Sequence, residues 1–287
     1  MMTRAFAIAC LCLFATHAGA QEAAPVEPDV VVRALLDYSG QKRLLGMILA
    51  EAQDSYSQVA RKQQLTPAEY KRFQAAMKKA FQFEPLYQVV VEHYRAAYHP
   101  QHTRQVLDWM RGPEGQKIMP HEQRAARGKD AQARRKYAQQ LQARPLPATR
   151  EALIEQVKEA SRATELNLRL LSVTLRSAMT AANAAMPEAK RVPAHVLEEV
   201  ILRTVAKNEP GLRQSVRANM LYTYRNLTDD ELRAYFKFFD SDAGRWYVRT
   251  GIDAHMKALE LAGTQMGTEM GKIFSEKDKQ KRKQRGR

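Results

Sequence analysis

Histidine side chains gather near the end of one predicted helix, where they could bind a metal ion. His93, His99 and His102 fall within one short stretch, and Glu92 could add a carboxylate ligand. Pro100 interrupts the helix between His99 and His102, so their spacing does not set the mutual geometry that a metal ion requires. We therefore predict no metal site and no cofactor.

Acidic and nucleophilic residues form no recognisable catalytic motif. The chain lacks the G-x-S-x-G, P-loop and G-x-G-x-x-G patterns, and His121-Glu122 has no second histidine to complete a zinc-protease motif. The acidic cluster Asp229-Asp230-Glu231 is explained by favourable negative charge at a helix N-terminus. The sequence therefore predicts no catalytic residues, and an enzyme is the third of three alternatives for function.

The end of the chain, residues 276–287, is a cationic segment in a protein of formal net charge +15. It contains no large apolar residue, and this composition predicts a disordered tail. Each positive charge near an anionic membrane contributes about 1 kcal/mol, while the lack of aromatic residues makes nucleic acid an unlikely partner. The tail is either a solubilising segment or an anion-binding one, with these candidate residues: Lys277, Lys279, Lys281, Arg282, Lys283, Arg285 and Arg287.

The first twenty residues, 1–20, have the pattern of a secretory signal peptide. Arg4 precedes a short apolar run, and an Ala-Gly-Ala site predicts cleavage after Ala20. We expect an exported, periplasmic protein. Both cysteines, Cys10 and Cys12, lie inside the signal, so the mature chain would have neither a disulfide nor a thiolate metal site.

Helical spacing of apolar residues dominates the rest of the chain. A polar linker, residues 21–28, precedes the first predicted helix. Thr66, Pro67 and Glu69 predict a helix start, because threonine caps the helix, proline fits its first position and glutamate completes a capping box. Glycine and proline are too scarce for a turn-rich β protein, so the predicted fold class is all-α.

The helical pattern occurs twice, which predicts two tandem helical-bundle repeats of about 120 residues each. The Glu-Pro pairs at Pro85 and Pro210 lie 125 positions apart, and Gly115 and Gly244 lie 129 positions apart. The predicted boundaries are repeat 1 at 29–144, a proline-containing linker at 145–149 and repeat 2 at 150–275.

Each repeat ends in a corner between two helices, with an aromatic residue before it and a glycine in the first turn after it. Gly115 and Gly244 reduce helix propensity by up to about 1 kcal/mol relative to alanine. That cost suggests that a Cβ would collide with a neighbouring group. The expected neighbour is an aromatic ring, Trp109 in repeat 1 and Phe238 or Phe239 in repeat 2.

The corner segments LDWMRGPEGQKI (107–118) and LTDDELRAYFKFFDSDAGRW (227–246) carry a family resemblance. They resemble the domain of unknown function 2059 family, found in exported bacterial proteins, whose pattern begins Leu-Thr-x-x-Glu-Leu and ends Gly-Gln-Lys. Repeat 2 keeps Thr228 and Glu231 as a capping box, and repeat 1 keeps the Gly-Gln-Lys that starts at Gly115. The resemblance implies a helical fold and an exported location, and it brings no catalytic residues.

The two copies depart from this pattern in opposite places. Repeat 1 has Tyr98-His99 where Leu-Thr would stand and His102-Thr103 where Glu-Leu would stand, whereas repeat 2 has Arg-Trp after Gly244. The copies have therefore divided the signature between them. That division fits selection for a shared scaffold better than for a shared active site.

Three glycines spaced by four, Gly263, Gly267 and Gly271, form a bare ridge on the last predicted helix. Polar residues between them exclude a membrane span, so the ridge predicts close approach of another helix in water. That helix belongs either to the same chain or to a second protomer, which would make the protein a homodimer.

Taken together, these residues predict a non-enzymatic exported helical protein with an interaction or structural role, whose partner would be another envelope protein or an anionic envelope surface. A deep pocket lined by convergent polar side chains would count against this interpretation. The alternative is a protein that binds anionic envelope surfaces, phospholipid headgroups or lipopolysaccharide, through the tail and a basic segment at 122–144.

Overall fold

The computed structural model describes residues 27–62, 65–125, 131–184, 186 and 188–285. The predicted signal peptide, residues 1–20, and nearly all of the predicted linker at 21–28 lie outside the described residues. The prediction of an all-α fold is confirmed, because the described part of the chain contains helices and no strand.

The helices follow one another through short connections, several of only two residues. Their bounds are α1 Pro28–Tyr38, α2 Gln41–Lys62, α3 Pro67–Ala80, α4 Phe83–Ala96, α5 Pro100–Arg111, α6 Pro113–Ala125, α7 Ala131–Ala143, α8 Ala148–Ala160, α9 Ala163–Ala184, the 3-10 turn η1 Glu188–Lys190, α10 Ala194–Thr223, α11 Asp229–Asp240 and α12 Asp242–Arg285.

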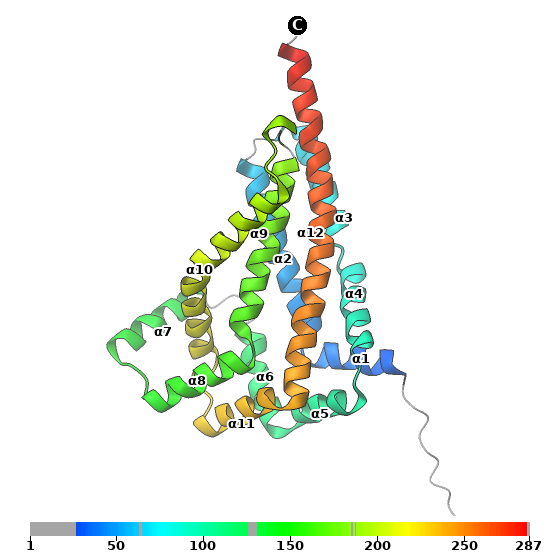
Figure 1. The fold of residues 1–287 in the computed structure, drawn as a ribbon. Coiled ribbons are helices and arrows are strands. Elements are labelled where there is room, and N and C mark those ends of the chain that lie inside the picture. Colours follow the sequence, from blue (N-terminus) through cyan, green and yellow to red (C-terminus); the bar gives the residue numbers. More distant parts are fainter. Residues whose placement is uncertain (1–26, 63–64, 126–130, 185, 187, 286–287) are drawn as a thin grey trace, which may run out of the picture.

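The long helix α12 runs through the centre of the molecule (Figure 1). It packs against α9 of its own half and against α3, α4 and α5 of the other half. The shorter helices α5, α6 and α11 cross one end of this bundle (Figure 1), where α5 packs against α6 and α11 packs against α8. None of the helices that the structure describes is long and apolar enough to cross a membrane.

One hydrophobic core joins the two predicted repeats. Leu36 and Tyr94 from the first half and Val157 and Met266 from the second are all fully buried in the same cluster. The halves therefore interlock instead of forming two separate bundles. The physical reason is α12, whose apolar face is too long to be covered by the helices of its own half.

Some helices of the two halves nevertheless correspond in order and length, whereas the 14-residue helices α3 and α4 have the single 30-residue helix α10 in their place, and α6 has 13 residues where α12 has 44. The helices α2 and α9 both have 22 residues, and α5 and α11 both have 12. The only described residues with positive φ are Gly40 and Arg162, at 78° and 51°, and each follows a serine that ends the preceding helix, Ser39 or Ser161. These two corners lie 122 positions apart, close to the offsets of 125 and 129 noted in the sequence, and the tandem repeat itself stays a prediction.

The predicted capping boxes at Thr66 and Thr228 are both present. The Glu69 N–H donates to the Thr66 hydroxyl at 3.3 Å, and the Glu231 N–H donates to the Thr228 hydroxyl at 3.2 Å. Each glutamate returns the contact, because its carboxylate accepts from the backbone N–H of the threonine. Local sequence was sufficient to place these two helix starts.

The end of the chain differs from the prediction. Helix α12 continues to Arg285, so the prediction of a disordered tail is wrong for the backbone of 276–285. Lysine, arginine, glutamine and glutamate are all favourable in helices, and none of the residues 276–285 is a glycine or a proline. A helix already fixed by the core needs no new nucleus to extend through such a segment.

Candidate binding cavity between the two halves

The corners of the two halves meet through their aromatic residues. The ring of Trp109 on α5 stacks on that of Phe238 on α11, with centroids 4.0 Å apart and planes 12° apart. Trp109 also stacks on Tyr235, with centroids at 5.4 Å. Trp109 and Phe238 lie 129 positions apart, at equivalent places before Gly115 and Gly244. Equivalent residues are therefore in direct contact.

The corner glycines allow two helix ends to touch. A Cβ at Gly115 would lie 2.5 Å from the backbone oxygen of Trp109, and one at Gly244 would lie 1.9 Å from that of Phe238. The predicted collision is therefore present, but the prediction that an aromatic ring causes it is wrong. The neighbour in both corners is the backbone that precedes the turn, which cannot move aside as a ring can.

Two further contacts between the corners also follow the offset of 129 positions. Lys117 pairs with Glu231 at 3.0 Å, and the Trp246 ring lies beside the His102 ring with centroids 6.0 Å apart. Position 117 corresponds to 246, and 231 corresponds to 102, so each contact is the counterpart of the other. The Thr228 backbone and Lys117 hold the pKa of Glu231 below its ordinary value. Such reciprocal contacts are what an approximate two-fold axis produces.

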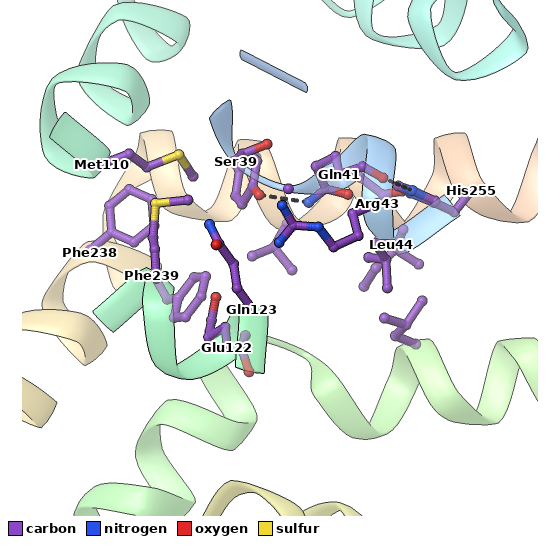
Figure 2. Close-up of a pocket in the computed structure, with 18 of the residues that line it drawn as sticks. Ser39, Gln41, Arg43, Leu44, Met110, Glu122, Gln123, Phe238, Phe239 and His255 are labelled. Carbon is purple, nitrogen blue, oxygen red and sulfur yellow. Dashed lines mark hydrogen bonds between the residues drawn. The ribbon is translucent and has the colours of Figure 1, made fainter. Parts of the chain in front are cut away.

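A cavity of about 250 Å³ lies beside this junction (Figure 2). Several of its lining residues form equivalent pairs from the two halves, which places it close to the approximate two-fold axis. The pairs are Ser39 with Ser161, Leu44 with Leu166, Trp109 with Phe238, Met110 with Phe239, and Met119 with Val248.

Most of the cavity wall is apolar, and few polar atoms interrupt it. Gln41 lines the cavity, and its Oε1 atom is buried without a hydrogen-bond partner among the described residues, whereas the Ser39 hydroxyl has Tyr247 as a hydrogen-bond partner. The other end of the Gln41 amide donates to the Tyr247 hydroxyl at 2.7 Å. An unsatisfied buried polar atom costs free energy, so its presence beside a cavity suggests a site for an added molecule.

Arg43 brings a positive charge to the cavity. No carboxylate lies within ion-pair distance of it among the described residues, and the residue is exposed. Met47, one helical turn further along α2, also lines the cavity and is 38% exposed. These two side chains mark the mouth. In Figure 2 the side chains of Arg43 and Gln123 extend toward each other across the cavity, from α2 and α6.

Glu122 on α6 brings a carboxyl group to the same cavity. Its Oε1 atom accepts a hydrogen bond from the Tyr224 hydroxyl at 2.7 Å and another from the Tyr235 hydroxyl. Burial raises the pKa of Glu122 above its ordinary value of 4.5, and these two hydrogen bonds offset part of the rise. Burial also keeps the pKa values of Tyr224 and Tyr235 well above 10.0, so both phenols stay protonated and donate.

His255 lies on the α12 side of the cavity and is 1% exposed. Its Nδ1 atom lies 2.7 Å from the Gly251 carbonyl oxygen, and its Nε2 atom lies 3.1 Å from the Gln41 carbonyl oxygen (Figure 2). A neutral imidazole can donate to only one of these acceptors. Burial nevertheless lowers the pKa of His255, with the two carbonyl groups acting in the opposite direction.

The structure brings three of the predicted corner residues to the cavity: Trp109, Phe238 and Phe239. Gly115 and Gly244 do not line the cavity, but they allow the close approach of the helices at the corners. Thr228 and Glu231 form the capping box at the start of α11. The side chains of the predicted anion-binding residues, Lys277 to Arg287, lie outside the described part of the chain.

The histidines considered as metal ligands have a structural role here. The Nδ1 atom of His99 accepts the backbone N–H of His102 at 3.2 Å, so His99 is the N-cap of α5. The two rings stack with centroids 3.7 Å apart. His99 thus occupies the cap position that the matched offset from Thr228 predicts. Within the described residues, no cluster of three or more histidine, cysteine and acidic side chains could hold a metal ion.

The glycine ridge packs partly against the same chain. A Cβ at Gly263 would lie 2.2 Å from the Ser177 hydroxyl on α9, and Gly263 is buried. At Gly263 the neighbouring helix therefore belongs to the same chain, which was one of the two predicted alternatives. Gly267 and Gly271 are half-buried, and a homodimer contact through them stays a prediction.

Sequence reasoning did not single out Arg43, Glu122 or His255 as cavity residues. One signal for Glu122 was present, because it follows the buried Ile118 by four positions and so lies on the inward face of α6. Arg43 and His255 come from helices more than two hundred positions apart, and no local pattern joins them.

Comparison of the chain with protein-family models, curated proteins and solved structures found no match. The resemblance to the domain of unknown function 2059 family therefore rests on the corner motif and stays a prediction.

Proposed function

We propose that this chain is a non-enzymatic, exported helical protein of the periplasm that binds a small, largely apolar molecule in the cavity between its two halves. The observation that carries the proposal is the cavity itself, which is walled by equivalent residues of both halves and has one buried polar atom, Gln41 Oε1, without a partner among the described residues. Ligand sites are typically apolar concavities with a few well-placed polar groups, often at the junction of two structural units.

The size of the cavity indicates a small ligand. A cavity of about 150 Å³ with apolar walls holds a benzene molecule. By proportion, a cavity of about 250 Å³ holds about ten non-hydrogen atoms. A deep pocket lined by convergent polar side chains would have counted against a non-enzymatic role. The wall of this cavity is mainly apolar, so that objection does not apply.

The arrangement of the polar groups favours binding over catalysis. Nucleophilic catalysis needs a nucleophile hydrogen-bonded to a base. Ser39 and His255 both line the cavity, yet both ring nitrogens of His255 face backbone carbonyl groups. Glu122 is likewise engaged by two phenol donors. These contacts hold His255 and Glu122 in place within the cavity wall. Enzymatic activity is therefore the weaker proposal.

Calorimetric titration of the mature protein with 1-octanol, a neutral molecule of suitable size, tests the proposal. We expect saturable binding at one site. Leu166→Trp should abolish it by filling the cavity, while Leu170→Trp, one turn along α9 and away from the cavity, should leave it unchanged. Both variants should keep the wild-type circular dichroism spectrum. An absence of binding to the wild type, or equal binding to Leu166→Trp, would overturn the proposal.

A second proposed function rests on the C-terminal part of α12. That part extends beyond the other helices as a helix through a cationic sequence (Figure 1). We propose that it binds anionic surfaces of the envelope, phospholipid headgroups or lipopolysaccharide. Co-sedimentation with anionic vesicles should be lost at high salt and on deletion of 276–287, while neutral vesicles should not bind. Unchanged sedimentation of the deletion variant would remove the tail from this role.

A further inference from the structure

The charges around the cavity point to one kind of ligand. Arg43, Glu122 and His255 are the lining residues with acidic or basic side chains. Arg43 is always charged, because a guanidinium group is always protonated. It stands at the mouth with no carboxylate partner among the described residues. The cavity therefore presents an unneutralised positive charge above an apolar interior.

The acidic group in the cavity does not neutralise Arg43. Glu122 forms no ion pair with it and instead accepts hydrogen bonds from Tyr224 and Tyr235. Its burial disfavours the charged form, as the raised pKa shows. His255 is also held in its neutral form by burial. At the mouth itself, the exposed Arg43 guanidinium group attracts an anion and repels a cation.

We propose that the cavity binds a carboxylate with an apolar body of about ten non-hydrogen atoms, whose charged end pairs with Arg43 at the mouth. The body lies among the aromatic and methionine side chains of the wall, such as Trp109 and Met119. A guanidinium group donates two parallel hydrogen bonds to a carboxylate, and the Gln123 amide on the facing wall offers a further donor. This inference rests on the proposed binding function and adds the class of ligand.

Three probes of the same length separate the charge from the apolar body. Octanoate, 1-octanol and octylamine are titrated into the mature protein by calorimetry at neutral pH. We expect octanoate to bind at least tenfold more tightly than 1-octanol, and octylamine to bind more weakly than either. Equal affinities for octanoate and 1-octanol would overturn the inference, and so would a preference for octylamine.

Variants of Arg43 test its role directly. Arg43→Gln should bring the affinity for octanoate down to that for 1-octanol while leaving 1-octanol binding unchanged. Arg43→Lys should keep part of the preference, because it retains the charge and loses the planar fork. The matched control is Arg61→Gln on the same helix, an exposed arginine that does not line the cavity. Unchanged octanoate binding in Arg43→Gln would overturn the inference.

Different results would contradict the binding function of the cavity and the carboxylate class of its ligand. If 1-octanol binds but octanoate binds no better, only the ligand class is wrong. If neither probe binds the wild type, the cavity is not a binding site and the proposed function itself fails. Because Arg43 is exposed and makes no ion pair among the described residues, its substitution should not affect folding, which circular dichroism would check.

Discussion

The corners α5–α6 and α11–α12 have the same backbone design and different side chains. Both preceding helices have 12 residues, and both corner residues are extended, Gly112 with φ −67° and ψ 170° and Ser241 with φ −71° and ψ 160°. Both then place a glycine against the backbone before the turn, at Gly115 and Gly244. The two corners therefore share one backbone geometry, and this geometry requires a glycine in the first turn of the following helix.

The capping chemistry differs between the two corners. The second corner begins with the Thr228 capping box and continues with Ser241, whose hydroxyl accepts the Gly244 N–H at 3.0 Å. The first begins with the ring nitrogen of His99 and continues with Pro113, which has no N–H to satisfy. Different residues thus meet the same requirement of a helix end. Shape is conserved between these corners more strictly than hydrogen-bonding chemistry.

Substitution of the second corner glycine should have the largest effect on stability. Gly244→Ala places a Cβ 1.9 Å from the Phe238 backbone oxygen, so the helices must move apart. We expect a loss of about 4 kcal/mol in the free energy of unfolding, measured by urea denaturation. Gly115→Ala, with its closest contact at 2.5 Å, should lose less. The comparison between corners would fail if Gly115→Ala were tolerated without loss.

The control for both variants is Gly211→Ala. Gly211 lies inside α10, and a Cβ there would meet nothing within 4 Å. Removal of a glycine from an open helical position should stabilise the protein by up to about 1 kcal/mol. An equal loss at Gly211 would show that the corner contacts are not the cause.

The aromatic contact between the corners should have the next largest effect. Trp109→Ala removes a ring that stacks on Phe238 and should lower the free energy of unfolding by about 3 kcal/mol. A double-mutant cycle with Phe238→Leu should give a coupling energy of about 1 kcal/mol, as expected for stacked rings. A coupling near zero would mean that the two corners contribute independently, and the reciprocal arrangement would carry no energy of its own.

These corners also show what local sequence can predict. The capping boxes at Thr66 and Thr228 were predictable, because a cap depends on residues within one turn. The need for glycine at Gly115 and Gly244 was predictable for the same reason. The neighbour of the glycine was not, since a short sequence shows that a Cβ is excluded but not which atoms exclude it.

The cavity and the interlocked core could not be predicted from the sequence. Arg43, Glu122 and His255 meet only because α12 of one half packs into the other, and no periodic pattern encodes that packing. The helical end of α12 was missed for a different reason. Its composition resembles a disordered segment when considered alone, yet it continues a helix that the core already stabilises.

The pH dependence of stability should distinguish the cavity from the corners. The folded protein raises the pKa of Glu122 above 4.5, so it binds this proton more tightly than the unfolded chain does. The resulting contribution to stability is fully present below pH 4.5 and is lost as the pH rises through the folded-state value. Glu122→Gln should therefore gain stability relative to the wild type as the pH rises above 4.5, by no more than about 1.4 kcal/mol per pH unit.

Urea denaturation of both proteins at several pH values measures this difference. Gln at position 122 still offers an oxygen to Tyr224 and Tyr235, so the variant tests the charge more than the contact. A stability difference that is independent of pH would show that Glu122 titrates as it does in the unfolded chain. The corner variants, which change no titratable group, should show no such trend.

The smallest effect compares the two caps. Thr228→Ala removes one of two reciprocal hydrogen bonds and should cost about 1 kcal/mol. His99→Ala removes a single bond of 3.2 Å from an exposed ring and should cost about half as much. Urea denaturation of the two variants gives the comparison, with Thr66→Ala as the reference for a capping box outside the corners. Because the backbone of both corners is held by glycine and core packing, neither cap should be needed for the fold. A loss above about 2 kcal/mol at His99 would instead make the histidine stack part of what holds the first corner.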